Sequence, residues 1–320
     1  LAAGVFFDAV KKSEQYRQAL VDFHEGHDTA VYVENIKEII DHPDKAPYYL
    51  NSIFDQLKNQ DDYDAFYASL SSNAKFVFTI PAYVCGLLLF YSGMLIGKTI
   101  KLNRLGNIER IELMPFGKGG RLFHWLRHAS SSRTTNEFYN NCVNAGLQLI
   151  IPDKTVSIKY HEEIENDNKT EVARGLCENN ELAIVDALND CDICGETGVR
   201  FIKDGNTISI APDDEISGEQ FSDDMSYFDF SGVQNFEKFM DIFIKFVSKD
   251  TKLYHRAEDS LRDEICELPT RIISFCTNDP EYKKASKNNK NGEGFHYHQP
   301  IIIAEGACFL KSLISKVFNQ

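Results

Sequence analysis

One turn near the middle of the sequence has the composition to hold a phosphate or a nucleoside. The run Gly117-Lys118-Gly119-Gly120-Arg121 follows an apolar segment that contains Ile108, Ile111 and Leu113. Glycines let a ligand approach the backbone closely, and a helix that begins after such a turn offers unpaired N–H groups and the positive end of its dipole. The spacing is that of neither a Walker A loop nor a dinucleotide-binding fingerprint, and a tight structural turn is the alternative interpretation.

Two cysteines with C-x-x-C spacing, Cys191 and Cys194, form a second candidate site. A structural zinc ion needs four ligands, and the nearest second pair, His296 and His298, lies far along the chain. The alternatives are a redox pair or two ordinary buried thiols. We expect ordinary thiols and assign no metal ligand. The chain's eight scattered cysteines indicate a reducing compartment, and we expect a cytoplasmic protein.

Other residues that could support chemistry do not form a recognisable site. The acidic groups 213–215 and 223–224 lack the spacing of an EF-hand calcium loop, so a solvated loop is expected there. The sequence contains neither an H-E-x-x-H motif nor a G-x-S-x-G motif, which counts against a metalloprotease and an α/β-hydrolase. Catalytic residues therefore stay unassigned.

The composition limits the classes of protein and of partner. The chain has 320 residues, is 43% hydrophobic and carries a net charge of −14, so it can bury a core and is not a disordered tail. Such an acidic surface repels phosphate backbones and anionic lipids, so we expect neither nucleic acid nor membrane as a partner. Binding of a single nucleotide in a pocket stays compatible with this charge, because backbone N–H groups can act locally.

The elements that would position the glycine turn alternate between strands and helices, which predicts an α/β fold. A strand over 108–113 leads into the turn, and a helix begins near Leu122. A second unit follows, with a short apolar run at 147–151, a strand over 156–160 and a helix from about Thr170.

The flanking segments have their own patterns. Residues 1–73 are predicted to be helical with polar breaks. The stretch 76–97 has no charge and is long enough to cross a bilayer, but Pro81 and its polar residues favour a strand over 76–80 followed by a buried helix.

The C-terminal half begins with a strong turn signal. Asp204-Gly205 between alternating arms predicts a β-hairpin over 199–210, and an acidic loop is expected over 211–230. Ser231 is expected to cap an amphipathic helix through Val247. A polar loop at 280–294 and an apolar helix opened by Pro300 complete the prediction.

The order of these features resembles the C-terminal half of the actin, Hsp70 and sugar-kinase superfamily, in particular bacterial Hsp70-like proteins. The matching pieces are the apolar segment Leu87–Gly93, the strand and turn from Ile108 to Gly120, and the later segment Lys169–Leu176. In that family a strand ends in a glycine pair that opens a helix and packs against the adenosine. The family's Asp-x-Gly-Thr phosphate hairpin has no counterpart in this chain, since Asp28-Thr29 lacks the glycine.

The resemblance implies an actin-like ATPase lobe over 1–185, an inserted α+β region over 186–299, and a C-terminal helix over 300–320 that returns to the core. It implies ATP with Mg²⁺ as ligand, held at Gly117, Lys118, Gly119, Gly120 and Arg121. Because the chain begins at Leu1, we interpret it as the C-terminal portion of a longer protein, whose N-terminal half an ATPase would need. A protein partner is the other way to complete the site. The alternative is a non-catalytic interaction or scaffold module with a degenerate actin-like fold.

Overall fold

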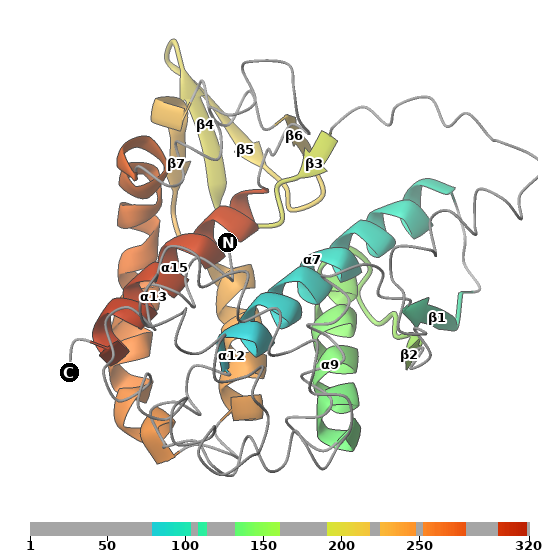
Figure 1. Ribbon diagram of the computed structural model, residues 1–320. Coiled ribbons are helices and arrows are strands. Elements are labelled where there is room, and N and C mark those ends of the chain that lie inside the picture. The colour runs from blue at the N-terminus through green and yellow to red at the C-terminus, as the bar shows by residue number, and fades with distance from the viewer. Residues whose placement is uncertain are drawn as a thin grey trace, which may run out of the picture.

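The computed structural model describes residues 79–103, 108–113, 132–160, 191–217, 225–247, 252–279 and 300–318. Within these residues the chain is a mixed α/β protein with five α-helices and three small sheets, and it has no closed barrel (Figure 1). This agrees with the predicted class. The helices expected within 1–73, near Leu122 and from Thr170 lie outside the described residues, as does the expected loop 280–294.

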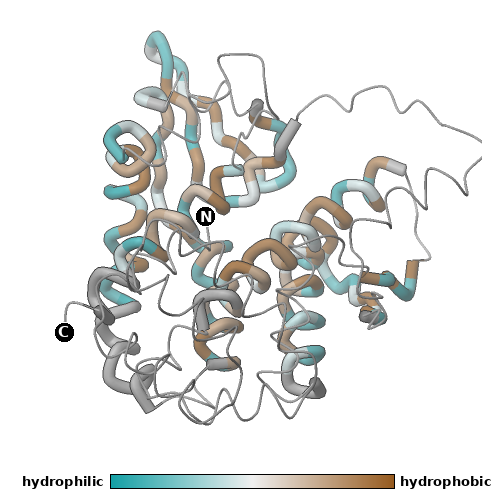
Figure 2. Tube along the Cα trace, in the orientation of Figure 1, coloured by the Kyte–Doolittle hydropathy of each residue, from teal (hydrophilic) through white to brown (hydrophobic). Residues whose placement is uncertain are grey.

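Two helices cross at close range on one side of the protein. Helix α7 (Thr79–Asn103) is apolar around its whole circumference, and Figure 2 shows it as hydrophobic over most of its length. It packs against α9 (Ser132–Ile150). The prediction of a strand over 76–80 is wrong for the two of its residues that the structure describes, because Thr79 and Ile80 form the first turn of α7. Pro81 lies in that turn, where its missing N–H removes no helical hydrogen bond.

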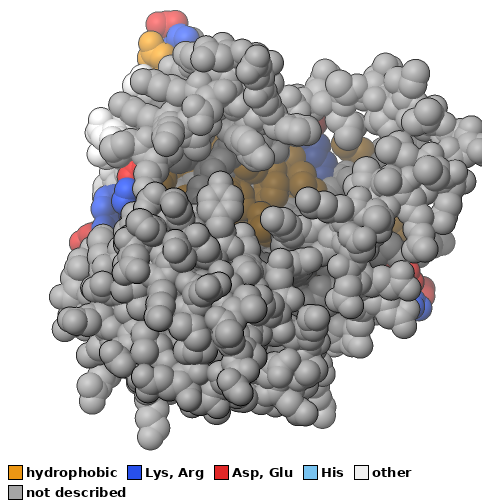
Figure 3. Space-filling view, in the orientation of Figure 1, with side chains coloured by type: hydrophobic (Ala, Val, Ile, Leu, Met, Phe, Trp, Pro, Cys, Tyr) orange, Lys and Arg blue, Asp and Glu red, His pale blue; other side chains and the backbone are white. Residues whose placement is uncertain are grey.

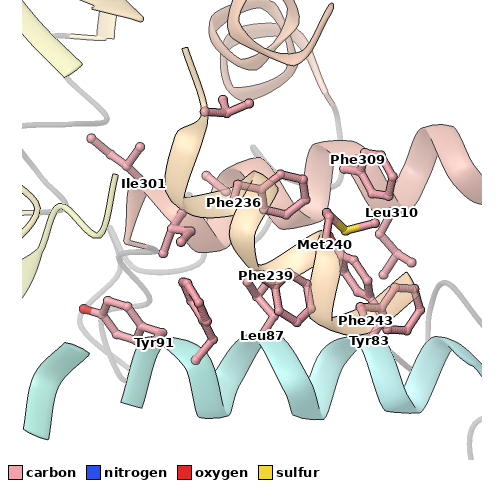
Figure 4. Packing of buried hydrophobic residues seen from close by; sticks show 14 of the residues in the cluster. Tyr83, Leu87, Tyr91, Phe236, Phe239, Met240, Phe243, Ile301, Phe309 and Leu310 are labelled. Carbon is pink, nitrogen blue, oxygen red and sulfur yellow. The ribbon is translucent and has the colours of Figure 1, made fainter. Parts of the chain in front are cut away.

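The remaining helices complete a core around α12 (Gln234–Val247). Its residues Phe236, Phe239 and Phe243 are fully buried, whereas its opposite face is exposed. Figure 4 shows these rings between the side chains of α7 and those of α15 (Ile301–Phe318). Helix α13 (Lys252–Asn278) packs along α15. The predicted helices after Ser231 and Pro300 are thereby confirmed.

A small parallel sheet lies beside one end of α7 (Figure 1). Strands β1 (Arg110–Leu113) and β2 (Ser157–Tyr160) pair in parallel register, with Ile111 opposite Ile158. Helix α9 lies between them in sequence, so the two strands belong to one strand–helix–strand unit. Both predicted strands are confirmed. The apolar run 147–151 begins inside α9, because its residues continue the helix face that contacts α7.

Two antiparallel sheets cover the other end of the core. Strand β4 (Val199–Lys203) pairs with β5 (Asn206–Ile210) through a two-residue turn in which Asp204 and Gly205 have φ values of 53° and 78°. Both residues have the positive φ of a type I′ turn, so the predicted hairpin is confirmed. The loop expected over 211–230 is wrong in part. It contains β6 (Glu215–Ser217), which pairs with β3 (Cys191–Ile193), a 3-10 turn η1 (Met225–Tyr227), and β7 (Phe228–Phe230), which pairs with β4.

One hydrophobic cluster joins these elements. It contains buried residues from α7 through α15 and therefore from each of the three predicted segments. In the view of Figure 3, coloured hydrophobic side chains gather near the centre of the molecule and charged ones lie at its margin. Within the described residues, one helix is long and apolar enough to cross a membrane; it spans Ala82–Leu102 of α7, and most of that stretch is buried inside the protein.

Candidate functional site

The predicted nucleotide turn follows directly from the parallel sheet. Strand β1 ends at Leu113, and the next described element is α9, which begins at Ser132. The residues Gly117, Lys118, Gly119, Gly120 and Arg121 lie between them, outside the described residues. The structure therefore describes the strand that precedes the turn, and it leaves the turn and the helix expected near Leu122 as predictions.

The elements around this edge are held by a small apolar cluster. Ile100 of α7, Leu147 of α9 and Val156 beside β2 are buried together. Asn144 fixes the approach to β2, because its side-chain amide accepts a hydrogen bond from Val156 N at 2.8 Å and donates one to Val156 O at 3.0 Å. These two hydrogen bonds hold the start of β2 against α9.

Of the two C-x-x-C cysteines, the structure describes the side chain of Cys194. Cys194 is buried, and its thiol donates to Glu196 O at 3.4 Å. Burial raises the pKa of this thiol, so it stays protonated at neutral pH. No group of three or more His, Cys, Asp or Glu side chains that could hold a metal ion occurs in the described part of the chain. His296 and His298 lie outside it.

The acidic residues 213–215 are partly neutralised by α7. Lys98 Nζ lies 2.6 Å from Glu215 Oε1, and Lys101 Nζ lies 2.6 Å from Asp213 Oδ2. The hydrogen bond from Lys101 holds the pKa of Asp213 below its usual value. These ion pairs attach β6 to α7. Asp223 and Asp224 lie outside the described residues.

The structure brings together two buried carboxyl groups that the sequence analysis did not single out. Glu196 follows β3 and Glu305 lies in α15, and both residues are 0% exposed. The carboxylate of Glu196 accepts hydrogen bonds from Asn235 N at 2.9 Å and Phe236 N at 2.9 Å, at the start of α12. Ser231, the expected cap, instead donates its hydroxyl to Gly198 O at 3.0 Å. A local pattern cannot reveal a cap that comes from a distant segment.

One sequence signal does mark Glu305. It is the sole charged residue between Pro300 and Lys311, in an otherwise apolar helix. A lone acidic residue among buried apolar residues needs a partner or a proton. No sequence signal marks Glu196, because this residue follows a short strand and its partners are backbone amides.

An open groove of about 540 Å³ lies between α9 and α12. Phe138 and Phe246 stack in its wall with ring centroids 4.1 Å apart. Asn141, Gln148 and Lys245 add polar groups at its rim. Neither Glu196 nor Glu305 lines this groove. Its described side chains include no group of three or more that could hold a metal ion.

Comparisons with known proteins identify no family for this chain. No protein-family model matches the chain. Neither the curated proteins nor the solved structures give a match.

Proposed function

We propose that this chain is the C-terminal portion of an actin-like or Hsp70-like ATP-binding protein and that it contributes the adenosine side of a nucleotide cleft. The observation that carries the proposal is the parallel pairing of β1 and β2 around α9. In the sequence, the glycine-rich run 117–121 comes shortly after the carboxyl end of β1, one of these two parallel strands.

That position is where α/β units usually bind ligands. The loops that follow the carboxyl ends of parallel strands open together at one edge of the sheet. A glycine-rich loop at this edge lets adenosine or phosphate approach backbone N–H groups. Lys118 and Arg121 would add positive charge beside the phosphates or the ribose, in a chain whose net charge is −14.

The proposal is limited to binding. The first phosphate loop and the catalytic carboxylate of the resembling family have no assigned counterparts in this sequence. We therefore expect weak binding of Mg²⁺-ATP and no rapid hydrolysis by these 320 residues alone. Tight, magnesium-dependent hydrolysis by this chain would contradict that part of the proposal.

Ligand-observed NMR with the full chain tests the binding. Saturation transfer to the adenine protons of millimolar Mg²⁺-ATP should be present in the wild type. The double variant Lys118→Ala/Arg121→Ala should bind at least about tenfold more weakly, because one charge-assisted hydrogen bond by itself contributes about 1.5–3 kcal/mol. Gly120→Val should remove the signal by blocking the approach to the backbone.

Gly205→Asn is the matched control, because this glycine lies in the β4–β5 turn and nothing lies within 4 Å of the position that a Cβ would take. Asn tolerates the positive φ of that turn. Equal signals from the wild type and all variants would show that the turn 117–121 is not the site. No signal from the folded wild type would support the interaction-module alternative.

A further inference from the structure

The segment between β3 and β4 is fixed against both α12 and α15. Gly195 has a φ of 78°, and a Cβ at this position would lie 2.7 Å from Ile302 Cγ2 on α15. Asn235 of α12 donates its side-chain amide to Gly195 O at 3.0 Å. The next residue, Glu196, is therefore held at the junction of the two helices.

Glu196 has the surroundings of an ionised carboxylate. Its Oε1 accepts hydrogen bonds from Thr197 N at 2.7 Å and Asn235 N at 2.9 Å, and its Oε2 accepts one from Phe236 N at 2.9 Å. These amides include the first unpaired N–H groups of α12, where the helix dipole also favours negative charge. Burial raises the pKa of Glu196 above its usual value, and the three backbone hydrogen bonds oppose that rise by stabilising the ionised form.

Glu305 has the opposite surroundings. Its side chain is 0% exposed, and no N–H or O–H group of the described residues donates to either of its oxygens. Burial and the adjacent Glu196 carboxylate both raise the pKa of the Glu305 carboxyl group. Two adjacent buried carboxylates cannot both be ionised without a large electrostatic cost, and a proton on one of them supplies the missing donor.

Among the described residues, the groups packed around this part of α15 do not supply a compensating cation. Tyr83 of α7 donates its hydroxyl to Gly306 O at 2.9 Å. The guanidinium of Arg271 on α13 is paired with Glu264. Two buried thiols lie beside the pair, Cys194 after β3 and Cys308 on α15, and the carboxylate of Asp214 acts on Cys194.

We propose that Glu196 and Glu305 share one proton, which is carried on Glu305 and donated to the Glu196 carboxylate, and that this hydrogen bond latches α15 onto the start of α12. When solvent removes the proton, two negative charges face each other in the core. The attachment of α15 then weakens, so the latch opens as the pH rises. No chemical group other than this one proton is gained or lost.

The direction of the pH dependence follows from comparing the pKa of Glu305 in the folded and unfolded states. An unfolded glutamate has a pKa near 4.3, whereas burial and the charge of Glu196 raise the pKa of Glu305 well above its usual value in the folded protein. The folded state therefore holds about one proton more than the unfolded state between these two pKa values. Over that interval the unfolding constant should rise by up to tenfold for each pH unit, relative to a protein without this group.

Denaturant unfolding of the full chain at several pH values between 5 and 8.5 tests the latch. Glu305→Gln keeps the shape of the side chain and donates an N–H to Glu196 without a titrating proton. The ratio of the unfolding constants of wild type and Glu305→Gln should grow by up to tenfold per pH unit. Glu237→Gln, an exposed residue in the first turn of α12, should give a ratio that is constant with pH.

Infrared spectroscopy of the wild type tests the same proton without any variant. At pH 7 the folded chain should show the C=O stretch of a protonated carboxyl group, and the band should disappear as the pH is raised. A chain with no such band at neutral pH would overturn the proposal, and so would parallel pH profiles of the wild type and Glu305→Gln. Stability at alkaline pH that depends on an added divalent cation would also overturn it, because the pair would then hold a metal ion.

Discussion

At the scale of single residues, the start of α12 shows how a distant side chain replaces a local cap. Glu196 lies 39 residues before Asn235 and 40 before Phe236, yet its carboxylate accepts both of their amide hydrogens. All three residues are buried, so water cannot serve as a substitute acceptor. The cap therefore joins the β3–β4 segment to the helix that organises the core.

Glu196→Gln should lower the free energy of unfolding by about 2 kcal/mol, because an amide nitrogen would replace one acceptor and leave a buried N–H unsatisfied. Urea unfolding followed by far-ultraviolet circular dichroism measures this change. Glu237→Gln removes an exposed carboxylate from the same helix turn and should cost less than about 1 kcal/mol. Equal losses in both variants would mean that general helix electrostatics, rather than the buried cap, explains the effect.

At the scale of elements, α7 and α9 touch through their backbones. A Cβ at Gly146 would lie 1.9 Å from Phe90 O, and a Cβ at Gly93 would lie 2.1 Å from Val143 O. The two glycines thus lie on either side of one crossing point. This close approach places α9, and with it the β1–α9–β2 unit, against the buried helix.

Gly146→Ala should lower the free energy of unfolding by about 2 kcal/mol, because the added methyl group would force the helices apart. This loss is expected although alanine is the better helix former by about 1 kcal/mol. Gln148→Ala, at an exposed position on the same helix, should change stability by no more than about 0.5 kcal/mol. Thermal or urea unfolding measures both. A Gly146→Ala variant that is as stable as the wild type would show that the crossing is looser than described.

At the scale of the whole molecule, one buried cluster includes residues on both sides of the predicted boundaries at 185/186 and 299/300. Cys142 of α9, Cys276 of α13 and Cys308 of α15 are buried in it. Burial raises the pKa of Cys308 to about 11, so its thiol is protonated and unreactive near neutral pH.

These three thiols should become reactive together when the protein unfolds, because one shared core favours cooperative unfolding. Alkylation at increasing urea concentrations, followed by peptide mass spectrometry, gives a midpoint for each thiol. Cys266 is exposed on α13 and should be alkylated without urea. If Cys276 reacted at a clearly lower urea concentration than Cys142, the segment 186–299 would unfold as a separate domain.

The sequence determined the elements that depend on neighbouring residues. Asp204-Gly205 specifies its turn because both positions need a positive φ, and the apolar face of α12 follows from the spacing of its phenylalanines. The short strands β6 and β7 escaped prediction because three-residue strands carry almost no periodic signal of their own. These two strands form through their hydrogen bonds with β3 and β4, respectively.

Only the tertiary structure decided which polar groups meet. Glu196 and Glu305 belong to segments with no shared pattern, and their contact arises because α15 packs beside the start of α12. The crossing of α7 and α9 likewise depends on two glycines in different helices. Local patterns reflect hydrogen bonding and burial along one element, whereas caps, shared protons and helix crossings depend on the packing of elements that are distant in sequence.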